Sequence, residues 1–156
     1  MNLLHTDYHG DVTYSDEDLL FFPDGLFGFP GLKQYLPLYL NANDDSIILF
    51  QSVEEPLIVF ASLNPVYLFP DYTPVLTTEE LAVLGVSDSG ELSYYVLCSV
   101  QNDYRENTVN LKAPLAINPI TRQGIQVILE NSDYSFRCSL PDNVTRQTSQ
   151  EKQTGV

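Results

Sequence analysis

Residues 47–63, IILFQSVEEPLIVFASL, decide the fold that this sequence predicts. Residues 47–53 and 57–63 are rich in β-branched and aromatic side chains, which favour β-strands over helices. The acidic residues and the proline between them, 54–56, are a natural hairpin connection. The stretch therefore predicts two antiparallel strands joined by a short turn.

Strand-like patterns continue on both sides of this hairpin. Apolar and polar residues alternate over 8–14 and again over 109–117, which is typical of half-buried strands. Residues 92–100 form an apolar run that indicates a buried strand, and 125–129 predict a last strand after Gly124. Residues 25–31 hold three glycines and a proline and predict an apolar loop, which either packs into the core or contacts a partner.

One segment has the pattern of a helix. Thr77 can cap its first turn, and Glu80 three residues later completes a capping box. Gly85 is placed to end it, and Leu81 and Leu84 would pack it against the sheet. The pattern predicts one short helix in an otherwise β-rich chain.

These elements predict a mostly β, single-domain protein. We expect an antiparallel β-barrel-like arrangement or a strongly curled sheet with one short helix. The chain has 156 residues, of which 44% are hydrophobic, so it can bury a sizeable core. Residues 1–140 form the predicted domain, and the polar, aromatic-free residues 141–156 predict a mobile tail.

The charge of the chain is strongly negative. It has 21 Asp and Glu residues and 7 Lys and Arg residues, which gives a net charge of −14. Up to Asp103 there are 16 acidic residues and a single base, Lys33. Such a surface disfavours direct contact with nucleic acid or with an anionic membrane, and it attracts basic proteins. Solubility alone would account for the composition equally well.

The sequence also predicts where the protein works. It contains no run of about 18 apolar residues and no signal-peptide pattern, so we expect a cytoplasmic location. Cys98 and Cys138 are too few for a disulfide framework and are expected to be reduced packing residues.

A search for catalytic motifs leaves two weak candidates. The tripeptide Asp88-Ser89-Gly90 resembles the aspartic protease motif, although it is also ordinary turn chemistry. If residues 5–11 form a strand, one of its faces carries four possible metal ligands: His5, Asp7, His9 and Asp11. A solvated polar face accounts for the same residues more simply, so no catalytic residue, cofactor or metal is predicted.

Several segments, taken in order, carry a family resemblance. They are DYHG at 7–10, FPDGLFGF at 22–29, LFQSVE at 49–54, NP at 64–65, FPDY at 69–72, TVNLKAPLAIN at 108–118, GIQVIL at 124–129 and Tyr134. This ordered set resembles the FliW family of bacterial flagellar assembly factors and covers about residues 7–140.

The resemblance implies a compact, β-rich, cytoplasmic and non-enzymatic protein with two protein partners. Such proteins bind flagellin, and they sequester the RNA-binding translational regulator CsrA and so relieve repression of flagellin translation. The alternative from the motif search is an acid protease-like or metal-dependent hydrolase that uses Asp88 or the His5/His9 face. A purely structural assembly protein is a third possibility.

The predicted partner-binding residues lie in turns at the ends of apolar strands, where side chains are presented to partners. They are Glu54, Glu55, Asn64, Pro65, Phe69, Asp71 and Tyr72. The two proline-containing turns would equally well serve only the backbone geometry. Gly25, Gly28 and Asn110 are expected to serve backbone geometry.

Overall fold

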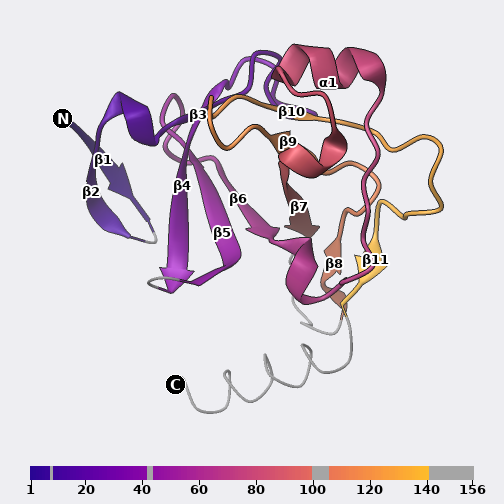
Figure 1. Cartoon of the computed structure of the whole chain (residues 1–156). Helices are drawn as coiled ribbons and strands as arrows, with labels where there is room; N and C mark the ends of the chain where they lie inside the picture. The colour runs from indigo at the N-terminus through magenta and orange to yellow at the C-terminus, as the bar shows by residue number, and fades with distance from the viewer. Residues whose placement is uncertain (8, 42–43, 100–105, 141–156) are drawn as a thin grey trace.

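A computed structural model describes residues 1–7, 9–41, 44–99 and 106–140. Within these residues it shows eleven strands, one α-helix and three short 3₁₀ turns (Figure 1). The strands are β1 (Asn2–Thr6), β2 (Gly10–Tyr14), β3 (Leu20–Phe21), β4 (Gln34–Asn41), β5 (Asp44–Ser52), β6 (Val59–Leu63), β7 (Ser93–Ser99), β8 (Thr108–Val109), β9 (Leu115–Ile117), β10 (Gly124–Gln126) and β11 (Cys138–Ser139). The helix is α1 (Thr78–Leu84), and the 3₁₀ turns are η1 (Asp16–Asp18), η2 (Pro65–Tyr67) and η3 (Ser89–Glu91). The predicted tail, 141–156, lies outside the described residues.

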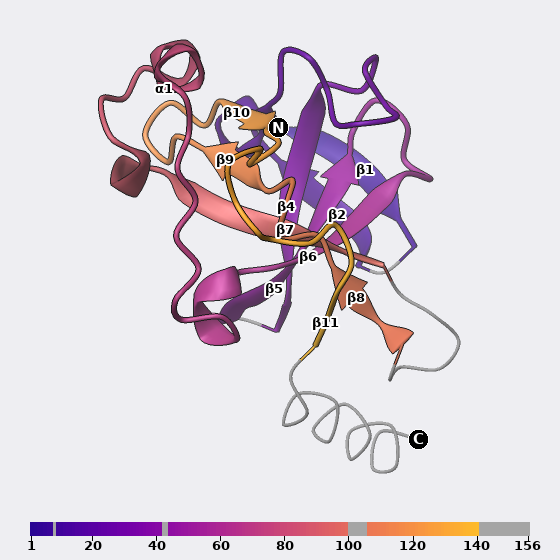
Figure 2. The ribbon, with the colours of Figure 1, turned by 90° about the vertical axis from the view of Figure 1, so that its right-hand side faces the viewer.

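Most strands belong to one antiparallel sheet. Its order is β10-β9-β7-β6-β5-β4-β3, and β8 pairs with both β7 and β11 beside this path. β1 and β2 form a separate two-stranded hairpin. Seen after a turn of 90°, α1 lies near β9 and β10, away from the β1–β2 hairpin (Figure 2).

The hairpin predicted from 47–63 is confirmed. β5 and β6 pair in antiparallel register, with Phe50 opposite Phe60. The side-chain amide of Gln51 is buried and donates to the carbonyl of Pro56 at 2.8 Å, which fixes the connecting turn. The Ser52 hydroxyl accepts a hydrogen bond from the Glu55 amide at 3.0 Å in the same turn.

The sheet curls but does not close. Between its two edges, β3 and β10, the only ladder contact of the described residues is one parallel bridge between Phe21 and Gln123, beside a hydrogen bond from the Phe21 amide to the Arg122 carbonyl. The Arg122 side chain also donates to the carbonyls of Asp18 and Leu19 there. Closure would need a continuous ladder between the two edges, and β3 has only two residues. No closed barrel is therefore found in the described part of the chain, and the barrel-like expectation is not supported.

The single strand predicted over 109–117 is wrong. The chain leaves β8 at Asn110, whose side-chain oxygen accepts from the Ala113 amide at 2.9 Å and turns the backbone. Pro114 has no amide hydrogen to donate, and the ladder resumes only at β9. Val109, Ala113 and all of β9 are buried, so the alternation seen in the sequence does not reflect one half-exposed strand.

The structure also shows strands that the sequence patterns did not predict: β1, β3, β4 and β11. β4 contains Pro37, and a proline in the sequence argues against predicting a strand at that place. Pro37 is tolerated because β3 pairs with β4 only at Gln34 and Tyr35, so the Pro37 nitrogen needs no partner on that side.

The helix prediction is confirmed at both ends. The Thr77 hydroxyl accepts from the Glu80 amide, and the Glu80 carboxylate accepts from the Thr77 amide. Gly85 has φ +71°, the left-handed conformation that suits glycine after a helix. Leu84 is buried and Leu81 packs beside it against β9 and the segment after β10.

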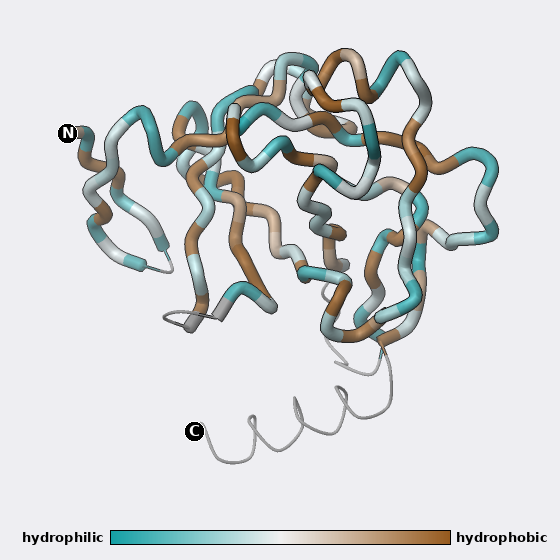
Figure 3. Tube along the Cα trace, in the orientation of Figure 1, coloured by the Kyte–Doolittle hydropathy of each residue, from teal (hydrophilic) through white to brown (hydrophobic). Residues whose placement is uncertain are grey.

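Among the described residues, the core consists of three clusters of buried side chains. The largest fills the inside of the curled sheet and includes Phe22, Tyr35 and Phe50. Hydrophobic residues concentrate along the central strands, and hydrophilic ones mark the peripheral turns (Figure 3). The sheet thus provides a rigid support for the loops at its ends.

Candidate functional site

Two open grooves lie on either side of one loop, residues 72–75. We call the first the Ile128 groove; it is formed by Phe27, by residues from 73–80 and by residues 126–134, and its volume is about 930 Å³. We call the second the Tyr94 groove; it is formed by residues from 64–66, 72–75 and 88–95 with Asp45, and its volume is about 620 Å³. Thr73 and Val75 line both grooves, so this loop is a shared wall.

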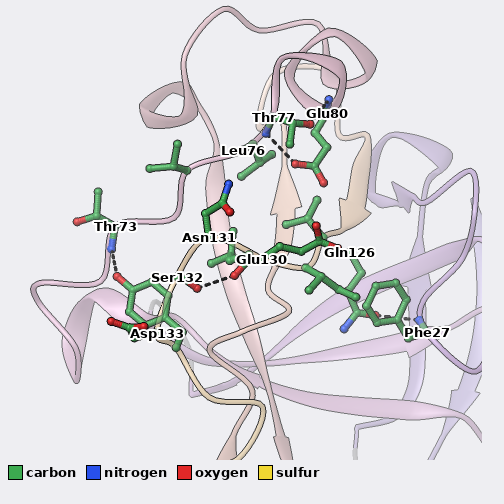
Figure 4. A pocket seen from close by; sticks show the side chains of 15 residues that line it. Phe27, Thr73, Leu76, Thr77, Glu80, Gln126, Glu130, Asn131, Ser132 and Asp133 are labelled. Atoms are coloured by element: carbon green, nitrogen blue, oxygen red, sulfur yellow. Dashed lines mark hydrogen bonds between the residues drawn. The ribbon is translucent and has the colours of Figure 1, made fainter.

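The Ile128 groove has an apolar floor and an acidic rim (Figure 4). The buried side chains of Leu76, Val127 and Leu129 lie beneath it. Three of its apolar side chains remain exposed: Phe27 at 52%, Val75 at 74% and Ile128 at 42%. Its acidic residues are Glu80, Glu130 and Asp133, and no Lys or Arg of the described residues lines it.

Hydrogen bonds fix the walls of this groove. The Gln126 side chain accepts from the Phe27 amide at 2.8 Å and donates to the Ala113 carbonyl at 3.1 Å. On the opposite wall the Thr73 amide donates to the Tyr134 hydroxyl at 2.9 Å. Figure 4 shows the Phe27–Gln126 and Thr73–Tyr134 contacts, which join segments that are far apart in the sequence.

The Tyr94 groove is lined by aromatic rings and turn residues. The Tyr94 hydroxyl donates to the Ser89 carbonyl at 2.7 Å, and burial raises the pKa of Tyr94. The Asp45 carboxylate accepts from the Tyr67 hydroxyl at 2.6 Å and from the side-chain amide of Asn64 at 3.2 Å. This groove therefore holds its acidic side chains in internal hydrogen bonds.

The seven predicted partner-binding residues do not form one patch. Asn64, Pro65 and Tyr72 line the Tyr94 groove. Glu54 and Glu55 lie in the β5–β6 turn, at the other end of β6, which is about 17 Å long. Phe69 packs against a core cluster, whereas Asp71 is exposed.

Several of these residues have clear structural roles. Asn64 caps η2 by accepting from the Val66 amide at 3.2 Å, and Pro65 is the buried first residue of that turn. The Tyr72 hydroxyl donates to the Leu111 carbonyl at 2.6 Å, and burial raises the pKa of Tyr72 above the usual range. These contacts agree with the interpretation that the proline-containing turns fix the backbone.

The two glutamates of the β5–β6 turn differ from each other. The Glu54 carboxylate accepts from the amides of Lys33 and Gln34, at 2.5 and 2.8 Å, and so anchors the start of β4. Glu55 is exposed, and its bond to Ser52 uses only its main-chain amide. Only Glu55 therefore presents a carboxylate without a role in the described fold.

Asp88 belongs to a capped turn. Its carboxylate accepts from the Gly90 amide at 3.1 Å, as the cap of η3. The Glu91 carboxylate accepts from the amides of Ser87 and Asp88, and these bonds lower the pKa of Glu91. Both carboxylates thus serve main-chain amides, a geometry that supports the turn interpretation of the tripeptide.

The His5/His9 face does not exist as a single strand. His5 lies in β1 opposite Asp11 of β2, and the two exposed side chains form a pair. His9 lies in the turn between the strands, where its Nε2–H donates to the Tyr39 carbonyl at 3.0 Å. Among the described residues, no three His, Cys, Asp or Glu side chains are grouped to hold a metal ion.

The two cysteines are separated by a strand. Cys98 and Cys138 pair with Val109 from opposite sides of β8, so their Cα atoms are about 10 Å apart, beyond the reach of a disulfide. Both are free, and burial raises the pKa of Cys98 to about 12.

Within the described ranges no helix has the length and apolarity needed to cross a membrane.

Sequence reasoning missed the Ile128 groove. The local signal is Ile128 itself, an exposed isoleucine between two buried residues, Val127 and Leu129. From the sequence alone, these three residues predict only part of an apolar strand. The other walls come from distant segments, which no local pattern brings together.

Comparison with known proteins gives one consistent result. The family model described as FliW protein matches residues 3–140, which include both grooves. A flagellar assembly factor FliW from Symbiobacterium thermophilum is 36% identical over 130 residues, which cover 83% of this chain and 94% of the relative. The one from Syntrophomonas wolfei is 35% identical over 147 residues, which cover 94% and 91%. A crystal structure of the flagellar assembly factor FliW matches with a TM-score of 0.81 and 33% identity, over 88% of this chain and 96% of that one.

Proposed function

Because the chain belongs to the FliW family of flagellar assembly factors, we propose that it regulates flagellum biogenesis by binding other proteins, without catalysis. The proposed partners are flagellin and the RNA-binding regulator CsrA. When flagellin is secreted, the freed protein sequesters CsrA and flagellin translation resumes. When flagellin accumulates, it occupies the protein and releases the regulator. Both partners act in the cytoplasm, where this protein would work.

The acidic surface is the observation that carries the proposal. Among the described residues the only ion pair joins His5 and Asp11 and involves neither Lys nor Arg. Two of the few cationic side chains bind main-chain carbonyls: Lys112 that of Ser132, and Arg122 those of Asp18 and Leu19. The carboxylates of the described residues thus have no Lys or Arg partner within the fold.

A surface of this kind suits an antagonist of an RNA-binding protein. It attracts the basic face that the regulator needs to hold RNA. It also repels RNA phosphates, so capture of the regulator can weaken RNA binding without covering the RNA site. Electrostatic or allosteric antagonism is therefore as compatible with this surface as steric blocking.

The hydrolase alternative receives no support from the geometry of its residues. Asp88 caps a turn, and His5 and His9 lie in different parts of a hairpin. Asp88→Asn tests this directly in cells, because a hydrolase that depends on the carboxylate would lose function. We expect unchanged motility and unchanged flagellin levels.

The proposed partners are tested with purified proteins. The protein is immobilised at low salt and offered the CsrA dimer and flagellin separately. We expect capture of both, with flagellin displacing the regulator when the two are mixed. If the protein captures neither CsrA nor flagellin at low salt, the proposal is disproved.

A further inference from the structure

The Ile128 groove combines features that suit a partner segment. Phe27, Val75 and Ile128 expose apolar surface in a concave site, above the buried floor of Leu76 and Leu129. Exposed apolar surface gathered in a groove marks a place where a partner's apolar side chains can be buried. Its walls are held by the hydrogen bonds of Gln126 and Tyr134, so little ordering is required on binding.

The charge of the rim identifies the kind of partner. Within the described residues, the carboxylates of Glu130 and Asp133 make no hydrogen bond and no ion pair, and both residues are exposed. They can therefore pair with cationic groups of a bound protein. In the Tyr94 groove, by contrast, Asp45 and Asp88 already accept hydrogen bonds from within the chain.

We propose that the Ile128 groove is the docking site of the basic regulator, and that it binds a segment whose apolar side chains are flanked by Lys or Arg. This inference rests on the proposed function, in which CsrA is the partner that must carry a basic surface. The apolar side chains of the segment would lie against Val75 and Ile128. Its cationic side chains would meet Glu130 and Asp133.

A pair of matched double variants tests the assignment. Ile128→Ser with Glu130→Lys changes the groove, whereas Ile120→Ser with Glu17→Lys makes the same two replacements elsewhere. Ile120 is 90% exposed and Glu17 is exposed in η1, and neither lines the groove. Both variants change the net charge equally. The affinities for purified CsrA and purified flagellin are measured for each by isothermal titration calorimetry.

The groove variant is expected to bind CsrA at least about tenfold more weakly than the wild type. The control variant should remain within about twofold of the wild type, and flagellin binding by the groove variant should be retained. Equal loss of CsrA affinity in both variants, or retained affinity in the groove variant, would overturn the assignment. A groove variant that loses affinity for flagellin but not for CsrA would also overturn the assignment. If the wild type itself binds no CsrA, the proposed function fails, which separates the two conclusions.

Folding of the groove variant is checked by thermal unfolding. Ile128 is only partly exposed, so its replacement by serine could lower stability. Glu130→Lys with Asp133→Lys changes the rim without touching the apolar side chains. This charge-only variant must also weaken CsrA binding more than the matched surface variant Asp16→Lys with Glu17→Lys, and equal effects would refute the proposal.

Discussion

Single polar side chains hold much of this fold together, and Tyr72 is the clearest case. Its hydroxyl binds the Leu111 carbonyl, and its ring packs edge-on against Tyr134 with centroids 4.7 Å apart. Tyr72→Phe keeps the ring but leaves the carbonyl without its partner. We expect a loss of about 1–2 kcal/mol in the free energy of unfolding, measured with chemical denaturant.

Tyr39→Phe is the control for this prediction, because Tyr39 is half exposed. Its stability should stay within about 0.5 kcal/mol of the wild type. An equal loss in both variants would show that the Leu111 contact is not the cause.

The two glutamates of the β5–β6 turn allow charge to be separated from fold. Reversing both charges should weaken capture of the regulator more than capture of flagellin, but Glu54→Lys would also remove the acceptor for the Lys33 and Gln34 amides. Glu54→Gln with Glu55→Lys keeps an acceptor oxygen. We expect a roughly threefold slower association with CsrA, measured by biolayer interferometry, because the steering charge is reduced.

Asp16→Asn with Glu17→Lys is the matched control, since both residues are exposed and the change in net charge is identical. A smaller effect in this control supports a local role for the turn. Equal losses for CsrA and flagellin, or no loss for either, would argue against the electrostatic account.

At the level of elements, α1 depends on its first cap. Thr77→Ala removes the oxygen that accepts from the Glu80 amide, at a cost of about 1 kcal/mol. For a domain of this size the melting temperature should fall by about 3 °C. Thr78 is exposed and lies one position into the helix, so Thr78→Ala should change the melting temperature little. Scanning calorimetry measures the melting temperatures of both variants.

The elements that sequence predicts well are those with local signals. The β5–β6 hairpin follows from its own apolar runs and turn, and α1 follows from Thr77, Glu80 and Gly85. β4 escapes prediction because Pro37 is harmless only where β3 has ended, a fact of tertiary structure. The strand predicted over 109–117 fails because Asn110 bonds to Ala113 and turns the chain.

The same distinction applies to the site. The turns of Asn64, Pro65 and Tyr72 are visible in the sequence, and all three residues line the Tyr94 groove, but their binding of a partner stays a prediction. The Ile128 groove joins Phe27, the loop before α1 and the segment after β10. Only the pairing of the whole sheet brings these segments together, so no window of sequence contains the groove.

For the molecule as a whole, the charge predicts a dependence on salt. Capture of CsrA should weaken by more than about tenfold between 50 and 500 mM NaCl, because salt screens the attraction between an acidic and a basic surface. Titration calorimetry over this range measures it. An affinity that is constant across the range would show that contact between apolar surfaces dominates.

The single bridge between Phe21 and Gln123 has a consequence for the motion of the whole sheet. Across this seam the described main chain makes only this one bridge, with side-chain hydrogen bonds from Arg122 to the carbonyls of Asp18 and Leu19 beside it, whereas the centre of the β5–β6 ladder is paired on both sides. In deuterated water we expect the Phe21 amide to exchange through brief local opening, and the Phe50 amide only when the domain unfolds. Nuclear magnetic resonance would resolve the two rates. The seam would thus open and reclose many times while the central hairpin stays intact.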